Sequence, residues 1–231
     1  MAKKKKWKSI VPSYAVVPLL SCVGINFIVY TWIAGFADSW KHYNLELAFD
    51  RAVPIIPEFV SVYLGCYLFW IVNYILIARQ GEEKCIRFAT ADILSRLICC
   101  GFFLLLPTTN VRPVIEGNGI WEQLLRFVYT VDAPTRLFPS IHCLVSWFCY
   151  IGIRGNKKIP GWYRIWSLIC AILIFISTQV TKQHYIVDVF GGVIIAELTY
   201  YIAMHTEIWR GTARIFHAIE RMTGKREKSE L

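Results

Sequence analysis

A histidine and an aspartate four residues apart, His184 and Asp188, mark the part of the chain best suited to chemistry. They lie where one apolar run stops and the next begins. If the second run is a helix, the two residues share one face of it, one turn apart. A carboxylate so placed fixes the tautomer of an imidazole and stabilises charge on it, as a histidine base or nucleophile requires. Lys182 adds a cation nearby, so the stretch predicts chemistry on an anion; an interfacial polar cluster is the simpler alternative.

A second group of residues, Pro139-Ser140-Ile141-His142, has the features of a helix start. Proline suits the first turn of a helix because its φ angle is locked near the helical value. The unpaired N–H groups of that turn attract an anion, and the Ser140 hydroxyl can join them on a phosphate. His142 could then give a proton to a leaving group. Arg112, followed by Pro113, offers a planar guanidinium that fits phosphate oxygens.

These residues resemble the three motifs of the type 2 phosphatidic acid phosphatase superfamily, which contains membrane lipid phosphatases and phosphotransferases. The matching positions, in chain order, are Arg112 and Pro113, then Pro139, Ser140 and His142, then Ser177, His184 and Asp188. Three positions depart from the family pattern, which has lysine, glycine and arginine where this chain has Leu105, Ile141 and Thr178. The altered pattern resembles the branch that includes inositol phosphorylceramide synthases more than the phosphatidic acid phosphatases proper.

The resemblance implies a catalytic role for three of the matching residues. His184 would be the nucleophile that takes the phosphoryl group, and Asp188 would orient it. His142 would be the general acid for the leaving lipid alcohol and later the base for the acceptor.

The resemblance also implies how the phosphate is held. Arg112 and Ser140 would bind its oxygens as charge shifts. Because two family cations are missing, Lys182 is expected to supply one charge, with Arg136 as a weaker candidate. The family implies no metal and no cofactor. A metal site made of two histidines and one carboxylate is the alternative, and it is disfavoured because nearby cations would repel a metal ion.

The composition indicates an integral membrane protein. Of the 231 residues, 56% are hydrophobic and only 18% are charged, and the mean hydropathy is +0.46. A span needs about 20 apolar residues, so six spans with short loops use nearly all of the chain. We therefore expect an all-α fold with six transmembrane helices in a single domain, residues 1–231. The six apolar runs are residues 14–36, 59–77, 96–106, 139–153, 162–177 and 184–204.

The distribution of basic residues predicts the orientation in the membrane. The net charge is +9, but 19 of the 25 Lys and Arg residues fall in alternate segments, as orientation signals do. Both ends are therefore expected inside, with a basic cytoplasmic N-terminus (1–12) and an amphipathic basic tail (206–231). A further amphipathic surface helix is expected near Trp121. The candidate site then faces the non-cytoplasmic side, and we expect membrane lipids and no nucleic acid as partners.

These observations predict a lipid phosphatase that hydrolyses a lipid phosphate monoester or pyrophosphate through a phosphohistidine, without a metal. Transfer of a phosphate-bearing head group to an alcohol is the second enzymatic reading. A non-catalytic lipid-binding scaffold or a transporter is the alternative of another class; paired broken spans, which inverted-repeat transporters show, are missing from the sequence. We expect a multi-pass protein of the plasma (inner) membrane.

Overall fold

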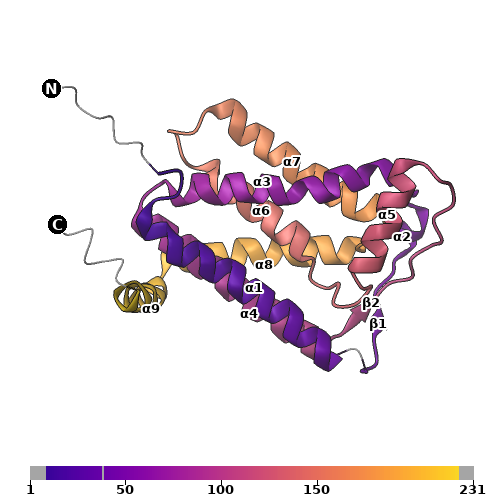
Figure 1. Ribbon diagram of the computed structural model, residues 1–231, viewed down its shortest axis with the longest axis horizontal. Helices are drawn as coiled ribbons and strands as arrows, with labels where there is room; N and C mark the ends of the chain where they lie inside the picture. Colours follow the sequence, from indigo (N-terminus) through magenta and orange to yellow (C-terminus); the bar gives the residue numbers. More distant parts are fainter. Residues whose placement is uncertain (1–8, 38, 224–231) are drawn as a thin grey trace.

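The computed structural model describes residues 9–37 and 39–223, and in this part of the chain the protein is a bundle of helices with one two-stranded sheet (Figure 1). The all-α prediction is confirmed. Most of the predicted segment 1–12 and the end of the tail, residues 224–231, lie outside the described residues. The elements in chain order are η1 (Ser13–Ala15), α1 (Val16–Ala37), β1 (Tyr43–Asn44), α2 (Ala48–Ala52), η2 (Pro57–Phe59), α3 (Val60–Ala78), α4 (Glu82–Leu105), β2 (Thr108–Thr109), α5 (Ile120–Val131), α6 (Ile141–Arg154), α7 (Gly161–Val180), α8 (Ile186–His205) and α9 (Trp209–Met222).

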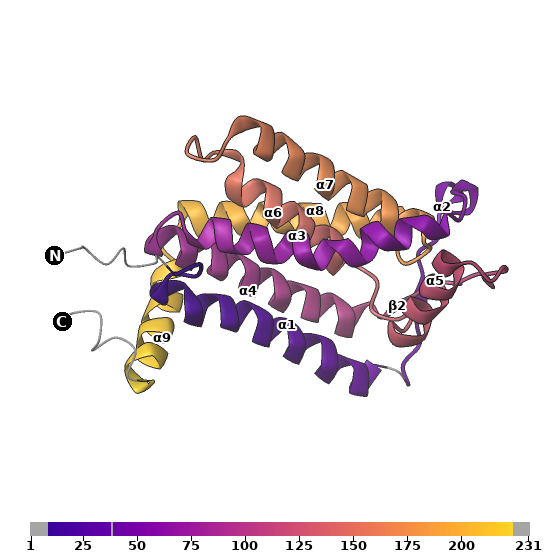
Figure 2. The same cartoon turned by 45° about the horizontal axis from the view of Figure 1, so that its top comes forward.

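The long helices run along one direction, with α9 at one end of the bundle and α2, α5 and the strands at the other (Figures 1 and 2). We call these the α9 end and the α5 end. Helix α6 lies in the interior, where it packs against α3, α7 and α8, while α1 packs on α4. The main core gathers large side chains of α4 and α6, among them Phe88, Phe103 and Phe148. Burial of these faces fixes where α6 begins, and that start carries part of the candidate site.

Five segments are long and apolar enough to cross a membrane: Ser13–Thr31, Pro57–Ala78, Glu82–Leu105, Gly161–Val180 and Ile186–His205. The protein is therefore a multi-pass membrane protein. The sixth expected span, α6, has only 14 residues, a length of about 21 Å against a hydrocarbon core of about 30 Å. Six spans and the orientation stay predictions.

The third span begins earlier than the sequence pattern predicted. The expected start was Arg96, but α4 already begins at Glu82. The prediction took residues 78–96 for a polar segment because of its basic residues, the last of which, Arg96, lies one turn after Asp92 on α4. Both are buried and pair with each other at 2.9 Å. Because this pair satisfies its charges inside the bundle, it does not end the helix.

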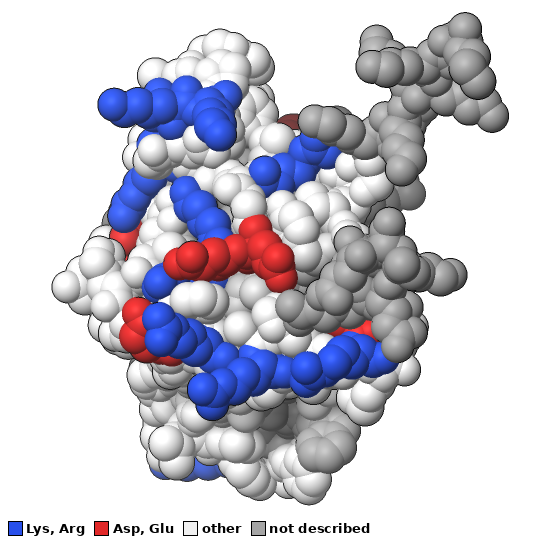
Figure 3. All heavy atoms as spheres, turned by 90° about the vertical axis from the view of Figure 1, so that its left-hand side faces the viewer, with Lys and Arg blue, Asp and Glu red and all other residues white. Residues whose placement is uncertain are grey.

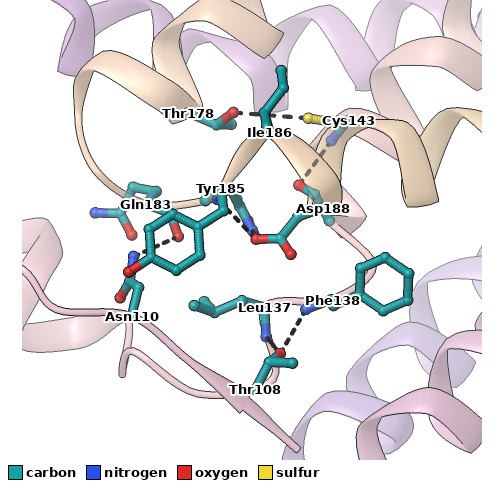
Figure 4. A network of polar contacts seen from close by, with 12 residues as sticks. Thr108, Asn110, Leu137, Phe138, Cys143, Thr178, Gln183, Tyr185, Ile186 and Asp188 are labelled. Atoms are coloured by element: carbon teal, nitrogen blue, oxygen red, sulfur yellow. Dashed lines mark hydrogen bonds and ion pairs between the residues drawn. The ribbon is translucent and has the colours of Figure 1, made fainter. Parts of the chain in front are cut away.

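Segments far apart in sequence are tied together at the α5 end. Strands β1 and β2 pair in parallel, with Tyr43 opposite Thr108. The Thr108 hydroxyl accepts hydrogen bonds from the backbone N–H groups of Leu137 and Phe138 (Figure 4). The Thr108 carbonyl accepts a third from the N–H of Arg136, at 2.9 Å. The loop after α4 thus fixes the chain that leads from α5 into α6.

The α9 end carries the amphipathic helix expected in the tail. Ala213 and Phe216 of α9 are buried against Ile86 and Ala89 of α4, and Lys and Arg side chains are spread over this end of the molecule (Figure 3). Helix α5 is amphipathic as well, with Leu125 and Val128 on its buried face.

Candidate active site

His184 and Asp188 are in contact, although they do not share a helix as the spacing suggested. Helix α8 begins at Ile186, so His184 lies in the preceding loop. Asp188, in the first turn of α8, accepts a hydrogen bond from the Tyr185 N–H at 2.9 Å, as a capping carboxylate does (Figure 4). The same carboxylate oxygen lies 3.3 Å from Nδ1 of His184. Asp188 therefore engages Nδ1 and leaves Nε2 of His184 for a reaction.

The two predicted catalytic histidines lie close together. The ring centroids of His142 and His184 are 5.8 Å apart. His142 follows the first residue of α6, and its ring stacks on that of Tyr63 of α3 at 4.5 Å. Trp70, also on α3, lies 5.5 Å from it. These aromatic contacts hold the His142 ring toward His184, so one phosphorus atom can lie between the two imidazoles.

Both histidines open into a cavity of about 290 Å³ at the α5 end of the bundle. Its wall combines aromatic rings with a few polar groups, which is the usual character of a small-molecule site. The lining residues are Asn26, Tyr30, Tyr63, Leu64, Tyr67, Trp70, Phe127, Val128, Val131, Asp132, Thr135, Arg136, Leu137, Ile141, His142 and His184. We call this space the histidine cavity.

Arg136, the weaker candidate from the sequence, lines the histidine cavity. It is only 6% exposed, and its guanidinium lies 4.9 Å from the ring of Tyr30. Its φ angle of 59° is in the left-handed region, which few residues other than glycine adopt. The backbone bond to Thr108 holds it there.

Asp132, which the sequence analysis did not single out, also faces the cavity. Its carboxylate accepts hydrogen bonds from the hydroxyls of Tyr30, at 2.7 Å, and Tyr63, at 3.0 Å. Burial alone would raise the pKa of Asp132, but the charge of His142, the Tyr30 hydrogen bond and the charge of Arg112 outweigh it and lower the pKa. Asp132 matches none of the three motifs, and the only available signal was its place at the end of the amphipathic helix.

The three predicted phosphate ligands lie outside the histidine cavity. The Arg112 guanidinium donates to the carbonyls of Tyr129 and Asp132 and, at 2.6 Å, to Oε1 of Gln183. It thereby connects α5 to the loop that carries His184. The Ser140 hydroxyl is fully buried and caps α6 by accepting from the Cys143 N–H at 3.3 Å.

The side chain of Lys182 points away from the histidine cavity, contrary to expectation. Its Nζ donates to the carbonyls of Asp50 and Val53, both at 2.6 Å, on the segment around α2. The structure therefore does not support the expectation that Lys182 supplies the missing phosphate-binding charge. Its φ angle of 52° turns the chain just before His184, so the residue shapes the loop instead. Lys182 is close to His184 in sequence, but its side chain points to the carbonyls of Asp50 and Val53 because these acceptors are within its reach.

The sequence left a metal site of two histidines and one carboxylate as an alternative. Among residues 9–37 and 39–223, no group of three or more His, Cys, Asp and Glu side chains is arranged to hold a metal ion.

Helix α8 approaches the start of α6 closely at Gly192. A Cβ atom there would lie 2.6 Å from the Ser140 carbonyl oxygen and 3.1 Å from the Leu144 nitrogen. Both are backbone atoms that cannot yield cheaply. The Ser140 N–H also donates to the Asp188 carbonyl at 3.0 Å. The distance between His142 on α6 and His184 before α8 thus depends on this contact.

Gly192→Ala is therefore expected to lower both stability and activity. Overpacking of this kind costs about 1–3 kcal/mol, and separating α6 from α8 should reduce kcat/KM by moving His142 away from His184. Thermal melting in detergent and phosphate release measure the two effects. Gly101→Ala on α4, where a Cβ meets nothing within 4 Å, is the matched control. Equal melting temperatures for the two variants would contradict the proposed contact.

Comparison with known proteins identifies the family. The model of the PAP2 superfamily matches residues 37–202, which include the strands, α2 to α7, most of α8 and all of the candidate site except the α1 residues. No curated protein matches the chain. The match covers more than half of the chain, and the chain belongs to the PAP2 superfamily.

Proposed function

We propose that the protein is a lipid phosphatase that hydrolyses a lipid phosphate monoester or pyrophosphate through a phosphohistidine intermediate. Family membership supports a membrane enzyme of the phosphatase or phosphotransferase type. The observation that carries the finer proposal is the pair of imidazoles with ring centroids 5.8 Å apart, one of them held by Asp188.

In the proposed first step, Nε2 of His184 attacks phosphorus and the bond from phosphorus to the lipid oxygen breaks. His142 gives its proton to that oxygen, so the lipid alcohol leaves neutral. Asp188 accepts the hydrogen bond from Nδ1 and stabilises the positive charge that the phosphorylated imidazole carries. In the second step His142 removes a proton from water, the water oxygen attacks phosphorus, and the bond to Nε2 breaks. Phosphate is released and both histidines return to their starting states.

The charge on the phosphate needs a cation inside the cavity. Arg136 is the basic residue in the cavity lining besides the histidines, and we assign it this role in place of Lys182. Its guanidinium can hold two phosphate oxygens at once. Arg112 acts as a positioning residue, because it connects α5 to the loop of His184.

Transfer to an alcohol is the second candidate, and Asp132 favours it. A carboxylate oxygen retains acceptor capacity after one tyrosine hydrogen bond, so Asp132 can accept from the hydroxyl of an incoming alcohol. With a phosphodiester lipid as donor, the first step releases the lipid alcohol and leaves the phospho-head group on Nε2 of His184. The hydroxyl of the bound alcohol then replaces water in the second step: His142 removes its proton, its oxygen attacks phosphorus, the bond to Nε2 breaks, and the product is a new phosphodiester. The inositol phosphorylceramide synthase-like assignment belongs to this candidate.

One assay tests both candidates and the non-catalytic alternatives. The purified protein is given a panel of lipid phosphates, lipid pyrophosphates and phosphodiester lipids with and without alcohol acceptors, and free phosphate and new phospholipid are measured. A hydrolase releases phosphate without an acceptor, whereas a transferase forms a new lipid only with one. If neither product forms with any donor, and wild type matches His184→Ala, the enzymatic proposal is wrong and a scaffold or transporter remains.

Turnover is expected to survive chelators. The proposed mechanism neutralises the phosphate with Arg136 and imidazoles, where many other phosphoryl-transfer enzymes use Mg²⁺. Phosphate release should therefore be the same in EDTA as in its absence. Loss of activity in EDTA that an added divalent ion restores would count against the mechanism.

We also place the active site on the non-cytoplasmic side of the plasma membrane, because the α9 end carries the basic segments that remain inside in most membrane proteins. A cysteine introduced at Glu116, an exposed residue near the α5 end, should react with a membrane-impermeant reagent in intact cells. Labelling only after permeabilisation would reverse the orientation.

A further inference from the structure

A second cavity continues from the histidine cavity along the bundle. It has a volume of about 380 Å³ and is formed by α1, α3, α4 and α6. We call it the lipid groove. Its lining residues are Leu19, Cys22, Val23, Asn26, Tyr67, Trp70, Ile71, Tyr74, Ile75, Asp92, Arg96, Ile141 and Val145. Four of them also line the histidine cavity, namely Asn26, Tyr67, Trp70 and Ile141.

The lipid groove opens sideways from the bundle. Helix α1 packs mainly on α4, and α3 mainly on α6, so the two outer helices flank the groove and the two inner ones form its floor. Val23 on α1 and Ile71 on α3 lie on the rim, 67% and 58% exposed. Both belong to segments able to cross a membrane, so their surroundings are lipid chains. A chain can therefore enter the groove from the bilayer while its head group reaches the histidines.

The floor of this apolar groove contains one buried ion pair. Arg96 donates from Nη2 to Asp92 at 2.9 Å, and the hydroxyl of Tyr74 donates to the same oxygen at 2.8 Å. Arg96 is 2% exposed, and its Nε and Nη1 atoms have no hydrogen-bond partner among the described residues. Leaving N–H groups of a charged side chain unpaired in hydrocarbon is costly, and such residues usually serve a function.

The ion pair lies at a defined depth below the reaction centre. The ring of Trp70 is 5.5 Å from that of His142. Tyr74, which bonds Asp92, is one turn further along α3, a step of about 6 Å. Arg96 also lines the lipid groove, so its side chain lies beside the part of a bound lipid that begins a few bonds beyond the phosphate. In acyl lipids that part carries carbonyl oxygens, which are hydrogen-bond acceptors.

We infer that the lipid groove binds the chain of the substrate and that Arg96 donates hydrogen bonds to a carbonyl oxygen, of an ester or an amide, in the lipid backbone. The inference rests on the proposed function, because it names the class of lipid that brings its phosphate to His184. Arg96 is a specificity-determining residue in this account: acyl lipids pair its N–H groups, and lipids with only ether-linked chains do not.

Three lipid phosphates of equal chain length test the inference: one with ester-linked chains, one with an amide-linked chain and one with ether-linked chains only. The wild type should show kcat/KM at least tenfold higher on one or both carbonyl lipids than on the ether lipid, and the better of the two identifies the source of the carbonyl. In Asp92→Leu/Arg96→Met, which removes both charges and leaves neither buried alone, this ratio should fall to about one.

Arg154→Met/Glu197→Gln is the matched control. It removes an ion pair between α6 and α8, with atoms 2.7 Å apart, that lines neither cavity. The control should keep the wild-type ratio. If Asp92→Leu/Arg96→Met does not fold, as judged by gel filtration, Asp92→Asn/Arg96→Met takes its place, because it keeps an acceptor for the Tyr74 hydroxyl and places no donor at position 96. A wild-type ratio of one, or a ratio that survives loss of Asp92 and Arg96, overturns the inference and leaves the pair a structural one.

A binding measurement separates this inference from the proposed function. The thermal stabilisation of His184→Ala by the same three lipids requires no turnover. A larger stabilisation by a carbonyl lipid than by the ether lipid, lost when Asp92→Leu/Arg96→Met is added, supports the inference even if no lipid is hydrolysed. Equal stabilisation by all three lipids rejects it even if hydrolysis is observed.

Discussion

His184→Ala is expected to abolish both turnover and the phosphoenzyme. The other histidine that lines the histidine cavity is His142. It is placed to move protons, so we do not expect it to replace His184 as the nucleophile. Loss of a residue that works as part of a catalytic unit costs about 10⁴–10⁶-fold in kcat. Phosphate release measures the first effect, and trapping of an acid-labile, base-stable phosphoprotein with labelled substrate measures the second.

His142→Ala is the companion to this experiment, because it separates the two histidines by role. A general acid matters in proportion to how much the leaving group needs a proton. The variant should therefore be slow on a lipid alcohol ester and much less impaired on a phosphate ester with a good leaving group. Equal loss on both substrates would refute the division of roles, and a phosphoenzyme in His184→Ala would refute the choice of nucleophile.

Arg136→Met should reduce kcat/KM by about 10²–10³-fold, the usual effect of removing one preorganised donor from a transition state. The methionine keeps most of the buried aliphatic volume and removes the guanidinium that lines the cavity. Arg136→Lys should recover only part of the loss, because an ammonium cannot hold two oxygens in one plane. Melting temperatures of both variants show whether the fold is intact.

Lys182→Met is the matched control for Arg136, since both are basic residues with left-handed φ angles near the site. Lys182 contacts two carbonyls around α2 and does not line the cavity, so its loss should reduce kcat/KM by less than about tenfold, well below the about 10²–10³-fold expected for Arg136→Met. If Lys182→Met is as damaging as Arg136→Met while the melting temperatures stay alike, the phosphate charge is supplied by the lysine after all.

The sequence determined the helical bundle and the group of residues at the centre of the site. Apolar runs about 20 residues long leave the backbone no solvent partner in a bilayer, so each must become a helix. The contact of His184 with Asp188 was also predictable, although for a different reason. The spacing that places two residues on one helix face also allows the carboxylate of a first helical turn to reach back to the loop before it.

The helix boundaries depend on tertiary contacts that the sequence does not show. Arg96 reads as the polar edge of a span, but inside the bundle its charge pairs with Asp92, which also accepts a hydrogen bond from Tyr74, and α4 extends on both sides of it. The start of α6 was visible in Pro139 and Ser140, whereas its close approach to α8 depends on Gly192, where a Cβ atom would meet the backbone of α6.

The tertiary structure alone decided which charged side chains enter the cavity. Long side chains extend in several directions, and their choice depends on acceptors brought near by distant segments. Lys182 is nearest to His184 in sequence and turns to the carbonyls of Asp50 and Val53. Arg136 and Asp132 are much further from His184 in sequence. The bonds between Thr108 and the 136–138 segment, and the hydroxyls of two tyrosines, direct them into the cavity. Sequence spacing determines which residues can meet on one helix or across its first turn. Contacts between helices are determined by packing, because the separation of two segments in sequence does not tell how far apart they lie in the fold.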